Sequence, residues 1–145
     1  MWSAAQQKRL AVEEQILNRE LPQFRFHNRS GDTFVSGHQG ANGASRQYQL
    51  KLQLTPDYPY EMPMLYIASP TTLWKHRHKG TINAEGVSHA FHTQENGPGG
   101  CVQVCHFENW VSTNTCVAVF LKGILWIQAY EHHLATGDDI ADFLR

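Results

Sequence analysis

The sequence has little cysteine, no excess of either charge and no long uninterrupted apolar run. Its three cysteines are an odd number that cannot form a closed set of disulfide bonds, so we expect free thiols. Lys and Arg number 12 against 13 Asp and Glu, which leaves no strong positive field to hold nucleic acid or an anionic membrane. The longest apolar stretch, 116–127, is interrupted by Lys122 and is too short to cross a bilayer. Met1 leads directly into charged, helix-like sequence, so we expect a soluble, cytoplasmic protein without nucleic-acid or membrane partners.

What the chain does contain is sufficient for one hydrophobic core. Hydrophobic residues make up 41% of the 145 positions and charged residues 17%, a balance typical of globular rather than disordered chains. A chain of this length forms one compact domain by default. We therefore predict a single domain over residues 1–145.

The spacing of apolar residues in the first half predicts an α/β domain of the α+β type. A helix is expected over 4–21, with Ser3 as its N-cap and Pro22 as its end. Short runs that alternate polar and apolar residues then predict a four-stranded antiparallel meander. The expected strands are 24–27, 33–36, 48–54 and 64–68. Segment 37–45, GHQGANGAS, predicts an exposed and mobile hairpin tip.

The second half of the chain opens with a long segment that has no clear periodicity. Residues 71–100 are rich in Gly, His, Asn and Ser, and a loop of this length within a compact domain usually has a functional reason. A second helix is expected over 114–135, where apolar residues follow one stripe, and a short last helix over 138–144. We therefore expect the active site in the long loop.

The strongest chemical signal lies between Phe91 and Trp110. Residues 97–100, Gly-Pro-Gly-Gly, place little side-chain bulk before Cys101. A substrate chain can then approach the sulfur, and backbone N–H groups can face a developing negative charge. Cys101 is therefore the candidate nucleophile, although a small buried cysteine after a Gly-rich turn is the alternative interpretation.

Two other interpretations of the same segment concern metals and hydrolysis. Cys101, Cys105 and His106, with His89 or His92, are of the residue types that bind zinc. The spacing argues against a zinc site, because on one strand the two thiols would lie roughly 13 Å apart. A Cys–His hydrolase would instead need a histidine as base and an acceptor to orient it. The candidates for these roles are His89, His92 and His106, with Glu95 or Asn96 as the orienting group.

The order of these pieces resembles the ubiquitin-conjugating enzyme family, over nearly the whole chain. A helix ending at a proline, a Gly-containing hairpin and the strand YQLKLQL at 48–54 are followed by TPDYPYEMP at 55–63, which is similar to the family's Tyr-Pro turn. Phe91-His92-Thr93 stands where the family has Tyr-His-Pro, and Cys101 and Trp110 follow at similar spacings. The resemblance implies a UBC-like fold in which Cys101 carries a thioester.

The chain departs from the family pattern at one important position. The family's His-Pro-Asn is replaced by His92-Thr93-Gln94, so the amide that the family uses during attack by a lysine has to come from Gln94 or Asn96. A second register makes Cys105 the nucleophile, since it also precedes Trp110. The departure leaves three functions open: a conjugating transferase, a binding module without activity, and a thiol peptidase or isopeptidase assisted by His89, His92 or His106.

The segment WIQAYEHHLATG at 126–137 is similar to a signature of bacterial members of this superfamily. The length and the lack of an adenylating domain resemble the stand-alone conjugating enzymes of anti-phage operons that signal with cyclic oligonucleotides (CBASS). That resemblance implies a protein partner, the C-terminus of a CD-NTase, which is a cyclic-oligonucleotide synthase. It also implies a separate activating enzyme or direct attack on a peptide bond, and no metal or other cofactor.

Overall fold

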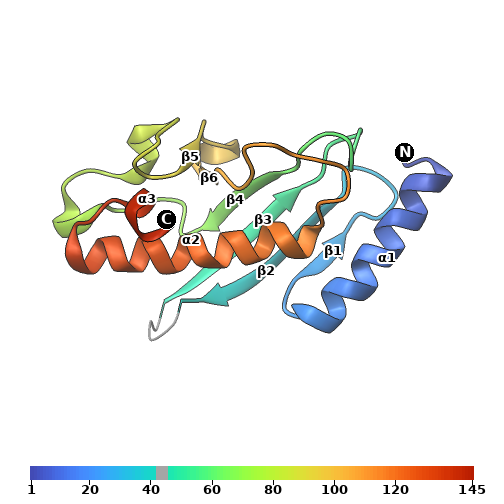
Figure 1. Cartoon of the computed structure of the whole chain (residues 1–145), viewed down its shortest axis with the longest axis horizontal. Helices are drawn as coiled ribbons and strands as arrows, with labels where there is room; N and C mark the ends of the chain where they lie inside the picture. The colour runs from blue at the N-terminus through green and yellow to red at the C-terminus, as the bar shows by residue number, and fades with distance from the viewer. Residues whose placement is uncertain (42–45) are drawn as a thin grey trace.

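The chain forms an N-terminal helix, an antiparallel sheet and two C-terminal helices (Figure 1). In the computed structural model the described residues are 1–41 and 46–145. The helices are α1 (Ala4–Glu20), α2 (Cys116–Thr136) and α3 (Ile140–Phe143). The strands are β1 (Arg25–His27), β2 (Phe34–Gly40), β3 (Gln47–Gln53), β4 (Met64–Ser69), β5 (Thr93–Gln94) and β6 (Val102–Val104).

The sheet has six strands among the described residues, in the order β1-β2-β3-β4-β6-β5, and every neighbouring pair is antiparallel. The predicted meander is confirmed for β1 to β4. The prediction of four strands in total is wrong, because β6 and β5 extend the sheet beyond β4. Both strands are too short to show an alternating pattern. β6 pairs with β4, which is distant in sequence, and β5 pairs with β6.

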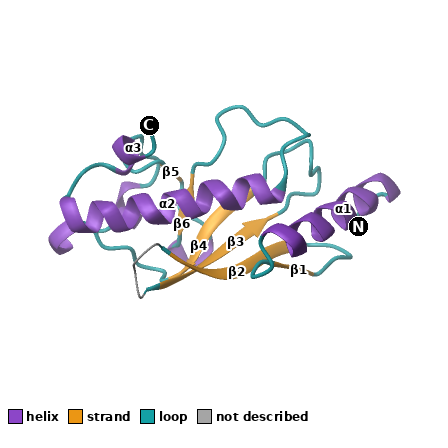
Figure 2. Ribbon diagram, turned by 60° about the horizontal axis from the view of Figure 1, so that its bottom comes forward, coloured by secondary structure: helices purple, strands orange, loops and turns teal. Residues whose placement is uncertain are grey.

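One face of the sheet is covered by α2, which lies across the strands (Figure 2). Alternate residues of β3 and β4 are buried on this face, including Leu50, Leu52 and Leu65. At Gly123 the helix comes so close that a Cβ atom would lie 2.8 Å from Leu65 Cδ2. The other residues of β3 and β4, such as Lys51 and Tyr66, therefore point to the opposite face, which we call the open face.

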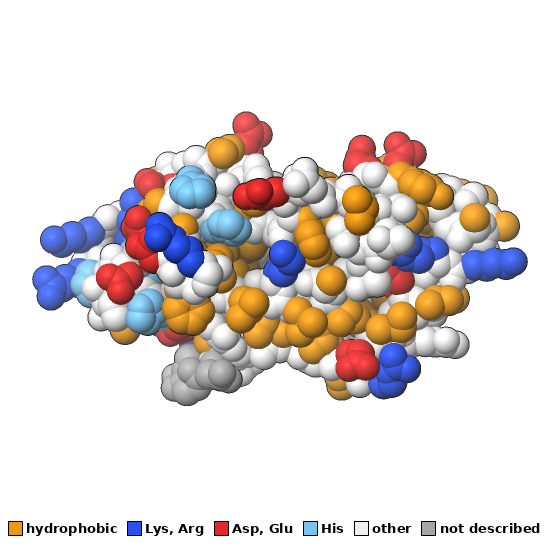
Figure 3. Space-filling model, viewed as in Figure 1, with side chains coloured by type: hydrophobic (Ala, Val, Ile, Leu, Met, Phe, Trp, Pro, Cys, Tyr) orange, Lys and Arg blue, Asp and Glu red, His pale blue; other side chains and the backbone are white. Residues whose placement is uncertain are grey.

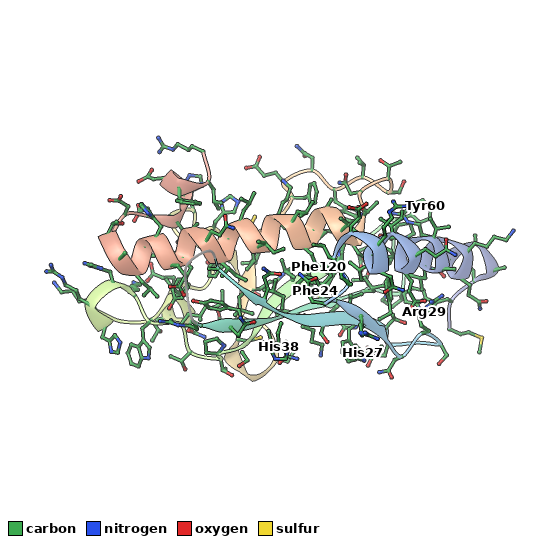
Figure 4. The ribbon with its side chains drawn as sticks, turned by 90° about the horizontal axis from the view of Figure 1, so that it is seen from below. Phe24, His27, Arg29, His38, Tyr60 and Phe120 are labelled. Atoms are coloured by element: carbon green, nitrogen blue, oxygen red, sulfur yellow. The ribbon has the colours of Figure 1, made fainter. Side chains whose placement is uncertain are left out.

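Helix α1 begins and ends where the sequence predicts. The hydroxyl of Ser3 accepts a hydrogen bond from the Gln6 N–H (3.1 Å), and the Gln6 side chain accepts one from the Ser3 N–H (2.9 Å). The helix ends at Glu20, just before Pro22. Phe24, which follows, stacks on Phe120 of α2 with ring centroids 4.0 Å apart (Figure 4).

A buried carboxylate connects α1 to the start of α2. Glu13 is 2% exposed, and its Oε1 accepts the Cys116 N–H at 2.6 Å. Its Oε2 accepts hydrogen bonds from Arg9 Nε (2.9 Å) and from the hydroxyl of Tyr58. We call Glu13, Arg9, Tyr58 and Cys116 the Glu13 cluster. It joins α1, the turn before β4 and the first residue of α2 in one hydrogen-bonded unit.

Other predicted elements are shifted by the structure. Residues 37–40 of the expected hairpin tip belong to β2, and 42–45 lie outside the described residues. The last helix is shorter than expected, at Ile140–Phe143. No helix within the described residues is long and apolar enough to span a membrane. Acidic and basic side chains are interspersed over the face shown in Figure 3, so that face has no large patch of one charge.

Candidate functional site

Cys101 follows a tight turn built by glycines. A short 3-10 turn, Pro98–Gly100, ends at Cys101, and β6 begins at the next residue. Gly99 and Gly100 have φ values of 73° and 81°, in the left-handed region that favours glycine. The turn is closed by hydrogen bonds from the Gly97 N–H to the Cys101 carbonyl (2.8 Å) and from the Gly100 N–H to the Gly97 carbonyl (3.0 Å). The Gly-rich stretch therefore fixes the position of the thiol.

The turn is held against the sheet by Tyr66 and Asn83. The Tyr66 ring lies directly against Gly97, so a Cβ atom at position 97 would overlap it. Asn83 Nδ2 donates hydrogen bonds to the carbonyls of Gly100 (2.8 Å) and Thr71 (2.7 Å), and its Oδ1 accepts one from the Leu73 N–H (2.9 Å). Asn83 therefore ties the residue before Cys101 to the chain that leaves β4.

The thiol is less open than the sequence suggested. Cys101 is 7% exposed, and the expectation of a freely accessible sulfur is wrong in that respect. Access is instead through a cavity of about 370 Å³ on the open face, which we call the thiol cavity. It is lined by Lys51, Gln53, Met64, Tyr66, Ala68, Thr71, Pro98, Gly99 and Cys101. A narrow chain that enters this cavity meets Cys101.

The surroundings of Cys101 favour a neutral thiol. Burial raises its pKa, while the backbone N–H groups of Cys101 and Gly97 and the positive charge of Lys51 act in the opposite direction. At neutral pH the thiol therefore stays protonated in the resting protein. Such a thiol suits an acyl donor that is already activated better than an amide bond, whose cleavage needs a stronger nucleophile and a base.

The expected histidine helpers lie elsewhere. His92, His106 and Cys105 line a separate cavity of about 130 Å³ against α2, together with Lys122 and Trp126. His106 Nε2 hydrogen-bonds the Pro63 carbonyl at 2.8 Å. Both histidines therefore lie with the alternative nucleophile Cys105. This group is on the other side of the sheet from the thiol cavity.

The remaining predicted helpers have different surroundings. Gln94 pairs with Gln103, which pairs with Tyr66, so Gln94 belongs to the open face that carries the thiol cavity. Asn96 donates a hydrogen bond through Nδ2 to the Asn83 carbonyl at 2.8 Å, which uses one of its amide protons. His89 is exposed on the loop before β5. Neither amide lines the thiol cavity, and Gln94 lies opposite Gln103 rather than Cys101.

Sequence reasoning missed Lys51 and Asn83. No Lys or Arg occurs between Gly80 and Asn109, which suggested a thiol without a nearby cation. The sheet brings Lys51 to the thiol cavity from a strand fifty residues away. The alternation in 48–54 did signal that Lys51 faces away from the core, but not what lies beside it. Nothing local in the sequence marks Asn83, because its side-chain partners come from two separate segments, residues 71–73 and Gly100.

Within the described ranges, no group of three or more His, Cys, Asp or Glu side chains is arranged to hold a metal ion. In comparisons with known proteins, no family model, curated protein or solved structure matches the chain significantly. The fold and the site geometry are thus the basis for the functional argument.

We expect the protein to lose stability as the pH falls below about 6.5. Burial lowers the pKa of His106, although its hydrogen bond to Pro63 acts in the opposite direction. Burial, with His89, also lowers the pKa of His92. In the unfolded chain both rings return to the ordinary value of 6.5, so acid protonates the unfolded chain first and favours unfolding.

Thermal denaturation between pH 7.5 and pH 5 measures this effect. The fall in Tm should be smaller in His106→Gln, which keeps a donor for the Pro63 carbonyl but does not titrate. His38 is exposed on β2, so His38→Gln serves as the control and should behave like the unmodified chain. An equal fall in all three proteins would show that His106 is not the group responsible.

Proposed function

We propose that the protein is a Cys101-dependent acyl transferase related to the ubiquitin-conjugating enzymes. The observation that carries the proposal is Cys101 in the wall of the thiol cavity, held by a glycine turn just before β6. The order of the helix, the meander and the cysteine-containing loop supports the same relationship.

The proposed reaction has two steps. In the first, the sulfur attacks the activated carbonyl of a donor polypeptide, forming a thioester on Cys101 and releasing the donor's previous leaving group with the thiol proton. In the second, a lysine amine attacks the thioester carbonyl. An amide bond forms, the carbon–sulfur bond breaks, and the proton that the neutral amine loses passes to the released thiolate, which restores the free thiol. By the sequence resemblance, the amide of Gln94 or Asn96 hydrogen-bonds the oxygen that gains charge in each step.

The position of the histidines favours transfer over peptide-bond cleavage. A thiol peptidase needs a base within hydrogen-bond reach of its sulfur. His92 and His106 line the other cavity, and the pKa of Cys101 is raised rather than lowered. The proposed donor is therefore a chain activated by a separate enzyme. By the sequence resemblance, it is the C-terminus of a cyclic-oligonucleotide synthase of the CD-NTase class.

A model thioester tests the proposal without the natural partner. The purified protein is incubated with a short acetylated peptide, Ala-Ala-Ala-Gly, carrying a C-terminal N-acetylcysteamine thioester. Intact mass should show one acyl adduct that is removed by excess reducing thiol. The adduct should be lost in Cys101→Ala and retained in Cys105→Ala, a matched control for the second candidate nucleophile.

The outcomes separate the three functions. Loss of the adduct in Cys105→Ala alone would transfer the role to Cys105. No adduct in the unmodified protein would favour a binding module. Hydrolysis of an amide-linked peptide of the same sequence, without any second enzyme, would favour the peptidase.

A further inference from the structure

The thiol cavity contains an ammonium group without a counter-charge. Lys51 lines the cavity beside Cys101, and its charge influences the thiol. Its Nζ lies 4.5 Å from the centroid of the Phe34 ring on the neighbouring strand, an interaction that orients the side chain over the open face. None of the ion pairs between described residues includes Lys51. Residues 42–45 contain no acidic side chain.

The rest of the cavity wall fits the body of a peptide. Met64, Tyr66, Ala68 and Pro98 supply apolar surface, and Gln53 and Thr71 supply hydrogen-bonding groups. No Asp or Glu lines the cavity. An occupant that enters this cavity therefore meets a positive charge that forms no ion pair with a described carboxylate. The complementary occupant is an apolar or small-residue chain with one acidic side chain.

We propose that Lys51 is a specificity-determining residue. It selects acyl donors that carry an Asp or Glu within three residues of the donor residue whose carbonyl forms the thioester. This inference rests on the proposed function, since it assigns the donor's chemistry to the thiol cavity. An acidic side chain paired with Lys51 would hold the donor while the sulfur attacks. A donor with a neutral residue at that place would leave the Lys51 ammonium unpaired. Such a donor would bind to the cavity without this electrostatic attraction.

Peptide thioesters test the selectivity directly. Acetylated tetrapeptides ending in Gly as N-acetylcysteamine thioesters carry Glu at the first, second or third position, with Ala elsewhere, and each has a Gln counterpart. The initial rate of adduct formation on the full chain is followed by intact mass. At one position Glu should react about threefold to tenfold faster than Gln. The ratio should fall toward one as the salt concentration rises.

Variants of Lys51 identify the group responsible. The Glu-to-Gln rate ratio should stay above one in Lys51→Arg and fall to one in Lys51→Met. In Lys51→Glu, peptides with Arg at that position should react faster than their Gln counterparts. A ratio cancels any general change in thiol reactivity that follows from the loss of the Lys51 charge. Lys8 is exposed on α1, so Lys8→Met is the matched control and should keep the full ratio.

The failure of this inference is distinguishable from failure of the proposed function. Adducts that form at equal rates with Glu and Gln peptides, at every position, would overturn the role of Lys51 and leave the transferase intact. A ratio that survives in Lys51→Met would do the same. The absence of adducts with all peptides would overturn both. A Glu-to-Gln rate ratio in the unmodified chain that does not fall as the salt concentration rises would also overturn the role of Lys51, and this measurement needs no variant to fold.

Discussion

Replacing Glu13 by alanine should lower the free energy of unfolding by about 3–5 kcal/mol. The substitution leaves the Cys116 N–H, the Tyr58 hydroxyl and the Arg9 guanidinium without the carboxylate that they share. The first two groups lie in the buried interior, where an unpaired donor costs about 1–3 kcal/mol. Urea denaturation followed by circular dichroism measures the loss.

Glu14 provides the control for this prediction. It stands next to Glu13 on α1 but forms its ion pair with Arg29 at the surface, where each side chain is more than a third exposed. Glu14→Ala should therefore cost about 1 kcal/mol or less. Glu13→Gln should fall between the two, because the amide oxygen can still accept from Cys116 while the charge opposite Arg9 is lost. Equal losses in Glu13→Ala and Glu14→Ala would contradict the role of the Glu13 cluster.

The second large effect is expected at Trp126. The indole is 1% exposed, stacks on Tyr130 with centroids 5.7 Å apart, and donates from Nε1 to the Phe91 carbonyl at 3.0 Å. Trp126→Ala removes a large buried surface and leaves a cavity between α2 and the long loop. The expected loss in the free energy of unfolding is about 3–5 kcal/mol, measured by chemical denaturation.

Two comparison variants divide the Trp126 effect into its parts. Trp126→Phe keeps an aromatic ring but leaves the Phe91 carbonyl without its donor, so it should cost about 1–2 kcal/mol. Leu121 lies on the same helix and is 49% exposed, and Leu121→Ala should change stability by no more than about 0.5 kcal/mol. A Trp126→Ala loss as small as that of Leu121→Ala would show that the loop does not depend on α2.

The elements that the sequence predicted well are those whose signal is local. Ser3 and Pro22 bracket α1, and the alternation around Leu50 and Leu52 marks both the strand and its buried face. The glycines before Cys101 likewise mark their turn, because a left-handed backbone favours that residue type. In each case the physical cause lies within a few residues of the element it shapes.

The features that could not be predicted depend on contacts between distant segments. β5 and β6 are defined by their pairing with each other and with β4 rather than by their own few residues. Lys51 shares a cavity with Cys101 because β4 lies between β3 and β6 and pairs with both. His92 and His106 flank Cys101 in the sequence but line the separate cavity against α2. Closeness along the chain was a poor guide to closeness in space.

The separation of the two candidate thiols has a consequence for oxidative chemistry. Cys101 lines a cavity on the open face, whereas Cys105 lines one against α2. A disulfide bond requires the two Cβ atoms to lie about 4 Å apart, but the extended strand β6 between the two residues separates them by roughly 13 Å. Mild oxidation therefore cannot join Cys101 to Cys105 in a disulfide bond. A Cys101 oxidised by peroxide would need a small thiol such as glutathione to restore it.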